Sequence, residues 1–230
     1  PGPAVELFKE ALRLREDVQK ANPKDANAAR DVRVSHYRLA DAYLKVGDPA
    51  AALPHAKRAV AVAEALVKAL PKSLPLKQDL AFALAKLGDV YRAEKRTDHA
   101  VKQYEDAVRV IEPLAAGSPR DLFLQAVHGL FLAHAGRHAE AAKLAARVRD
   151  EAPKNAFLLY TAACAYAVAA EAAGESAGDP KLAADYAEAG LACLRAALAA
   201  GYADHDLVRT DPELAAVRKL PGFADVEKDL

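Results

Sequence analysis

The histidines and acidic residues that could do chemistry in this chain are spaced in ways that argue against catalysis. His134 and His138 are four residues apart, as two zinc ligands on one helical turn would be. Gly136 between them predicts an interhelix turn, which would separate the two rings. The Asp-His-Asp run at 204–206 has the residue types of a charge relay but no evident nucleophile beside it. We therefore predict no metal site and no catalytic residue here.

The serines and the missing phosphate-binding motifs lead to the same prediction. Only four serines occur, and Ser118, which precedes Pro119, is interpreted as a helix cap, while Ser176 falls in a loop. The chain also lacks a glycine-rich phosphate loop and the HRD, DFG and VAIK motifs of protein kinases. We expect no cofactor, and we expect that this chain is not an enzyme.

The amino-acid composition limits the classes of partner and the cellular compartment that we expect. Thirty-two basic and 32 acidic residues cancel, which disfavours nucleic acid or an anionic membrane as the main partner. Charges interrupt the apolar runs before the roughly 18 residues that a membrane span needs, so no membrane insertion is expected. Cys164 and Cys193 are interpreted as two buried thiols in a reducing compartment rather than a disulfide. We expect a soluble, cytoplasmic protein.

The elements that position these residues are predicted to be helix pairs. In residues 122–155, apolar residues recur at fixed offsets: Gly129, Leu132, Gly136, Ala141, Ala145, Val148 and Pro153. Two antiparallel helices approach closely only where small residues lie at their crossing, here Gly129 and Ala141. The spacing resembles the tetratricopeptide repeat. That resemblance implies an all-α, right-handed superhelical solenoid of antiparallel helix pairs.

The same pattern predicts the organisation of the whole chain. We expect residues 1–3 to be a linker or foreign to the natural chain, residues 4–20 to form a lone leading helix, and residues 201–230 to cap the array. Helix pairs are expected at about 26–70, 75–113, 119–153 and 156–200. Pro54 is expected to kink its helix or delay its start, and the helix that begins at Thr97 is expected to end near Pro113. The longer helices resemble those of kinesin light chains in length, not in sequence detail.

The tail is predicted to dock on the last repeat, because the end of a solenoid exposes an apolar face. Its apolar stripe comprises Leu207, Leu214, Val217, Leu220, Phe223 and Val226. Together with CAYA at 164–167 and LRAALAAGY at 194–202, the tail resembles the end-of-array segment of bacterial repeat proteins. Many of these follow serine/threonine kinase domains, notably in planctomycetes. The chain has no methionine and begins Pro1-Gly2-Pro3, so we expect a piece of a longer protein, with any kinase domain upstream.

A binding surface is expected on the first helix of each pair, which lines the concave face in the family that the chain resembles. Arg38 and Asp41 correspond, 48 residues on, to Lys86 and Asp89. Lys45 and Arg92 extend these two charged rows. The rows could contact a partner, or the charges of neighbouring helices could simply bridge. The family's binders of chaperone C-termini hold a terminal carboxylate with lysine and asparagine; Asp41 and Asp89 would repel such a ligand.

Further along the chain the same face is predicted to become apolar. Phe82, Phe123 and Phe157 occupy equivalent positions in three first helices and could stack into a ladder. Leu130 and Tyr160 extend the apolar face. Such residues are either core or a groove for an apolar anchor of a partner.

From these observations we predict a non-catalytic interaction scaffold that binds a peptide or protein segment along the concave groove. One alternative is a regulatory, substrate-recruiting C-terminal region of a bacterial serine/threonine kinase. A second alternative is self-association through the exposed face of the helix at 4–20.

Overall fold

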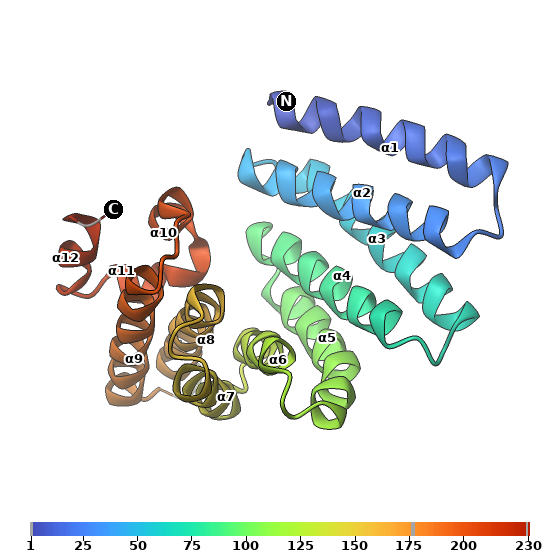
Figure 1. Cartoon of the computed structure of the whole chain (residues 1–230). Helices are drawn as coiled ribbons and strands as arrows, with labels where there is room; N and C mark the ends of the chain where they lie inside the picture. Colours follow the sequence, from blue (N-terminus) through green and yellow to red (C-terminus); the bar gives the residue numbers. More distant parts are fainter. Residues whose placement is uncertain (1, 176–177, 229) are drawn as a thin grey trace. The chain divides into compact units, whose positions relative to one another are not determined.

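The computed structural model describes residues 2–175, 178–228 and 230, and it divides into two compact units (Figure 1). Unit 1 comprises Pro1–Ile111 and unit 2 comprises Glu112–Leu230. The division falls within helix α5 (Thr97–Gly117). No strand occurs in the part of the chain that the structure describes, so the predicted all-α class is confirmed.

Unit 1 consists of consecutive helices that pack against their neighbours in the chain. They are α1 (Pro3–Ala21), α2 (Ala26–Lys45), α3 (Pro49–Ala69), α4 (Leu74–Ala93) and the part of α5 up to residue 111. α1 packs on α2, α2 on α3 and α3 on α4, and the first helices α2 and α4 also touch each other. Val5 of α1 is fully buried against Leu39 and Ala42 of α2. The leading helix therefore belongs to the packed array.

Unit 2 repeats the arrangement and adds a segment of short helices. It contains α6 (Leu122–His134), α7 (His138–Glu151), α8 (Ala156–Glu175), α9 (Pro180–Ala199), α10 (His205–Thr210), the 3₁₀ turn η1 (Pro212–Leu214), α11 (Ala215–Arg218) and α12 (Phe223–Lys228). α6 packs on α7 and α8, and α8 packs on α7 and α9. η1 and α11 pack on α8. Both units thus have the pairwise helix packing of a tetratricopeptide-like array.

Small residues allow the helix crossings, as the sequence predicts. A Cβ atom added to Gly129 of α6 would lie 3.2 Å from Leu144 Cβ and 3.6 Å from the Ala141 carbonyl oxygen of α7. A Cβ atom added to Gly88 of α4 would lie 2.8 Å from the ring of Tyr104, a buried residue of α5. Gly136 has a φ of +79° and forms the turn between α6 and α7, which separates His134 from His138.

Three local predictions are wrong or need revision. α3 begins at Pro49, so Pro54 does not delay its start. α5 continues through Pro113 to Gly117; proline forfeits one backbone hydrogen bond, but the next turn is held by buried Leu114 and Ala115. Asp121, not Ser118, caps α6, and its carboxylate accepts a hydrogen bond from the Leu124 amide. Ser176 lies outside the described residues.

α8 is nevertheless long and apolar enough to cross a membrane by length and composition, although Glu171 interrupts its apolar run before 18 residues. In the structure most of that helix is buried inside unit 2. α7, α9 and the short helices after α9 surround it. Packing on several sides accounts for its apolar sequence without a membrane.

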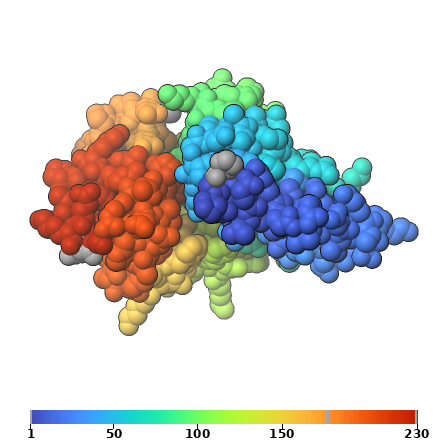
Figure 2. Space-filling view, turned by 90° about the horizontal axis from the view of Figure 1, so that it is seen from above, coloured from blue at the N-terminus to red at the C-terminus, as the bar shows by residue number. Residues whose placement is uncertain are grey.

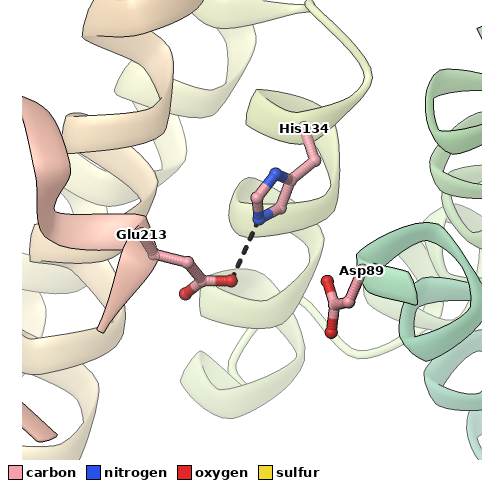
Figure 3. Close-up of side chains that lie close together, drawn as sticks. All are labelled: Asp89, His134 and Glu213. Carbon is pink, nitrogen blue, oxygen red and sulfur yellow. Dashed lines mark hydrogen bonds and ion pairs between the residues drawn. The ribbon is translucent and has the colours of Figure 1, made fainter. Parts of the chain in front are cut away.

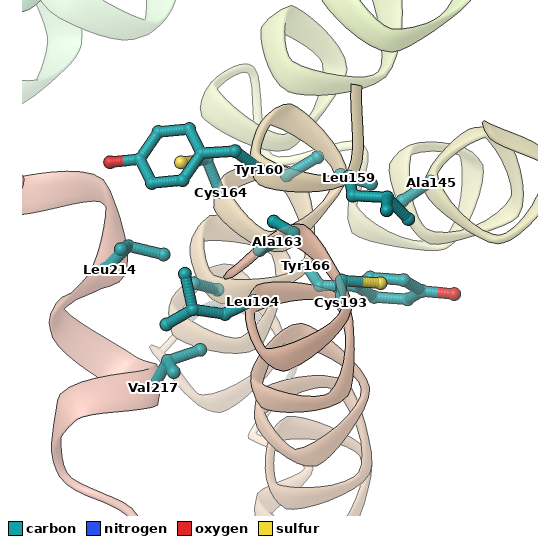
Figure 4. Packing of buried hydrophobic residues seen from close by; sticks show 14 of the residues in the cluster. Ala145, Leu159, Tyr160, Ala163, Cys164, Tyr166, Cys193, Leu194, Leu214 and Val217 are labelled. Carbon is teal, nitrogen blue, oxygen red and sulfur yellow. The ribbon is translucent and has the colours of Figure 1, made fainter. Parts of the chain in front are cut away.

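The C-terminal segment docks on the last pair of helices by the predicted apolar stripe. Of the stripe, Leu214 and Val217 (Figure 4), Phe223 and Val226 are buried, while Leu207 and Leu220 are partly buried against the same core. Val208, outside the predicted stripe, is buried there too. Cys164 of α8 and Cys193 of α9 are buried free thiols of this core. Burial raises the pKa of Cys193 to about 11, so it is protonated at neutral pH. We call residues 201–230 the cap.

Candidate partner-binding surfaces

The charged row of unit 1 forms a bridged network between α2 and α4. Lys86 Nζ lies 3.0 Å from Asp41 Oδ1 and 3.0 Å from Asp89 Oδ2, and Lys45 Nζ lies 3.3 Å from Asp41 Oδ2. The Tyr104 hydroxyl donates a 2.7 Å hydrogen bond to Asp89. Only 13% of the Lys86 side chain is exposed, against 71% of Lys45. Lys86 is therefore the internal cation of the network.

The pKa values of the network follow from its neighbours. Burial by itself lowers the pKa of Lys86, but Asp89, Tyr37 and Asp41 outweigh that effect and hold it well above its ordinary value. Burial likewise raises the pKa of Asp41, but Lys86 and Lys45 more than compensate and the net pKa is lowered. Bridging between charges, the alternative to partner contact, thus involves four of the six predicted charged residues: Asp41, Lys45, Lys86 and Asp89. The network fastens α2 to α4.

The part of the charged row that lies on α2 borders a cavity. It has a volume of about 310 Å³ and lies between the start of α1 and the end of α2. Arg38, Asp41 and Lys45 form its polar side. The remaining lining residues are Gly2, Ala4, Val5, Phe8, Ala42 and Val46. Arg92 lies on α4, half-buried and outside this lining. A partner role for Arg38 and Lys45 stays a prediction, and both are exposed.

In unit 2 the predicted apolar face presents one exposed aromatic pair. Phe123 and Phe157 lie in the first turns of α6 and α8, with ring centroids 6.2 Å apart and ring planes at 24°. Phe123 is 36% exposed and Phe157 is 53% exposed. Phe82 belongs to α4 in unit 1, so the aromatic pair of unit 2 consists of Phe123 and Phe157. Leu130 of α6 is half-buried against the core of unit 2.

Tyr160, the remaining predicted residue, is covered by the cap. Its hydroxyl donates a 2.6 Å hydrogen bond to Asp211 Oδ2, and its ring stacks on Tyr202 at 4.2 Å with the planes at 3°. It is 5% exposed, and burial raises its pKa far above the ordinary value. Tyr160 therefore attaches the cap to α8.

A second polar contact ties the cap to α6. His134 Nε2 lies 3.0 Å from Glu213 Oε1 (Figure 3). Sequence reasoning missed Asp211 and Glu213 as contact residues, since they lie 51 and 79 residues from their partners. The only local signal was the helix-start pattern at Asp211-Pro212, which says nothing of what the carboxylates touch.

Unit 1 also contains a histidine pair, of which His36 is buried and His55 is half-buried. His36 Nδ1 of α2 lies 3.0 Å from His55 Nδ1 of α3, and the His55 ring stacks on Tyr43 at 5.7 Å. Burial, and secondarily His55 and Arg58, lower the pKa of His36 to about 4. Burial also lowers the pKa of His55, so both rings are neutral at pH 7 and one Nδ1 donates to the other.

Comparison with known proteins identifies a repeat and a fold. Residues 83–112 match the family model described as tetratricopeptide repeat, a span that covers parts of α4 and α5. The search of curated proteins finds no match. Among solved structures, the crystal structure of BtubC (BKLC) from P. vanneervenii is similar, with a TM-score of 0.57 and 21% identity over 98% of this chain and 86% of that one.

These comparisons indicate the general class to which the protein belongs. The chain contains a tetratricopeptide repeat and has a helical repeat fold, and such repeats generally mediate protein–protein interaction. At 21% identity the likeness to BtubC shows the fold alone. The resemblance of the tail to kinase C-terminal regions stays a prediction.

Proposed function

We propose that this chain is a non-catalytic interaction scaffold and that unit 2 binds a protein segment through Phe123 and Phe157. The observation that carries the proposal is the exposed, stacked pair of rings on two successive first helices. Exposed aromatic side chains are typical anchors of protein interfaces. Because the rings come from two helices, a segment that crosses α6 and α8 can contact both.

The surroundings of Phe157 support an extended ligand. A wide, shallow depression of about 620 Å³ adjoins it, lined by residues 151–157. This stretch supplies the charged side chains of Glu151 and Lys154 and the amide of Asn155. An apolar anchor with polar groups at its rim is the usual anatomy of a protein interface.

A random peptide library displayed on phage tests the proposal. Peptides selected on the wild-type chain should share an aromatic or aliphatic anchor. Their affinity, measured by fluorescence anisotropy, should fall at least about tenfold on the Phe123→Ala/Phe157→Ala double variant. The matched control is Leu70→Ala/Leu74→Ala, which removes two apolar side chains of unit 1 that are 47% and 59% exposed.

The binding measurements distinguish a peptide-binding site from two phenylalanines that are merely exposed. Circular dichroism should show both double variants folded, since the four truncated side chains are 36–59% exposed. If no peptide is enriched, or if the selected peptides bind the phenylalanine variant as tightly as the wild type, the aromatic pair is not a binding site.

Self-association through α1 is a second candidate with its own observation. Leu7, Leu14 and Val18 of α1 are 72%, 52% and 54% exposed, and their spacing of seven and four residues places them on one helical face. In the space-filling view α1 lies at the surface of unit 1 (Figure 2). Light scattering should show a dimer that dissociates on dilution and is abolished by Leu7→Glu/Leu14→Glu. A monomer at every concentration would discount this candidate.

A further inference from the structure

We propose that the cap and α8 form a zinc site from Cys164, Asp211 and Glu213. Their ligand atoms, one sulfur and two carboxylate oxygens, all lie within 4.8 Å of one another. The ligand atoms around a tetrahedral zinc ion lie roughly 3.3–3.8 Å apart, given bond lengths of about 2.0–2.3 Å. Small side-chain movements would therefore bring the three groups onto one ion.

The surrounding groups are those that orient metal ligands. His134 Nε2 contacts Glu213 at 3.0 Å, and the Tyr160 hydroxyl donates to Asp211 at 2.6 Å. Ligating carboxylates in metal sites are usually hydrogen-bonded by such outer groups, which fix their orientation. A carboxylate has two oxygens and about four lone-pair positions, so each can keep its outer hydrogen bond and still bind an ion.

The donor set selects the kind of ion. A thiolate with carboxylate oxygens suits Zn²⁺, whereas Mg²⁺ and Ca²⁺ take oxygen ligands alone. Three protein ligands leave the fourth position of a tetrahedral ion for water or a neighbouring side chain. Cys164 is 1% exposed, and 20% of the Glu213 side chain is exposed, which gives an ion a route from solvent.

The position of the cluster gives the ion a structural role. Cys164 projects from the middle of α8, on the side of the cap residue Leu214 (Figure 4). Asp211 and Glu213 lie in the cap, where Asp211 caps η1 by accepting a hydrogen bond from the Glu213 amide. Zinc would cross-link the cap to α8 independently of the aromatic pair of the proposed function.

The test uses the full chain after a chelator has removed any bound metal. ZnCl₂ and CoCl₂ are then added to separate samples. Isothermal titration calorimetry should show one Zn²⁺ per chain, and the melting temperature should rise as zinc is added. Co²⁺ in the same site should give a thiolate-to-metal charge-transfer band in the near ultraviolet. Cys164→Ser should abolish the band, and Glu213→Gln should weaken zinc affinity at least about tenfold.

Cys193→Ser is the matched control, because Cys193 is equally buried in the same core. It should keep both the band and the zinc stoichiometry. Absence of stoichiometric zinc binding overturns the proposal, as does cobalt binding without a thiolate band; neither result requires a variant to fold. A band that persists in Cys164→Ser and vanishes in Cys193→Ser also overturns it.

Discussion

Replacing Lys86 with methionine tests whether the charged row of unit 1 holds the fold together. Lys86 is the one cation within 3.0 Å of both Asp41 and Asp89 among the ion pairs described for this network. Methionine keeps the length and the apolar stem of lysine but removes the charge. The substitution leaves two carboxylates on adjacent helices without that counterion.

The magnitude follows from the burial of the three side chains. Removing one member of a buried ion pair costs about 3–5 kcal/mol. The carboxylates here are 27% and 23% exposed, so water screens part of the charge that remains. We therefore expect the free energy of unfolding to fall by about 2–3 kcal/mol.

Lys45→Met is the matched control, since it removes a lysine that also contacts Asp41 but is 71% exposed. It should cost less than about 0.5 kcal/mol. Urea unfolding at pH 7, followed by circular dichroism, gives both values. Adding Asp41→Asn and Asp89→Asn to Lys86→Met should recover part of the loss. If Lys86→Met destabilises no more than Lys45→Met, the network does not stabilise the fold.

Three further predictions concern other parts of the molecule. His36 has a pKa of about 4 in the folded state against 6.5 in the unfolded chain. Its contribution to the free energy of unfolding is therefore complete above pH 6.5 and falls by up to about 1.4 kcal/mol per pH unit as the pH drops towards 4. Equal urea midpoints at pH 7 and pH 5 would contradict this. Gly88→Ala should lower the free energy of unfolding by about 1–3 kcal/mol, because the new Cβ would lie 2.8 Å from the Tyr104 ring. Gly117→Ala, whose Cβ would have nothing within 4 Å, should leave the urea midpoint unchanged. Tyr160→Phe should cost about 1 kcal/mol and speed hydrogen exchange in the cap, and unchanged exchange there would show that the hydroxyl does not hold the cap.

The fold was predictable from the sequence because the residues that set the helix crossings and turns act locally. Gly129 faces the Ala141 carbonyl, and Gly136 adopts the positive φ that its turn requires. Pro113 is the exception. Its lost hydrogen bond favours a break, but the burial of Leu114 and Ala115 beyond it keeps α5 helical. Tertiary packing outweighs the local preference there.

The candidate surfaces were less predictable, because exposure depends on residues far away in the chain. The repeat pattern places Lys86 and Phe157 on equivalent helices, yet Lys86 is 13% exposed as a side chain and Phe157 is 53% exposed. Tyr160 is three residues from Phe157, but the cap covers it through Tyr202 and Asp211. A periodic pattern assigns a helix face and does not say which later segment will fold over it.

The stacked tyrosines between α8 and the cap give the protein an optical signal of its own. The chain has no tryptophan and eight tyrosines, so no indole absorption overlaps that of the phenol rings. Tyr160 and Tyr202 lie parallel at 4.2 Å, a contact between α8 and the cap that exists only while the two are joined. Near-ultraviolet circular dichroism of the unmodified chain, compared with Tyr202→Leu, would therefore follow detachment of the cap without an added dye.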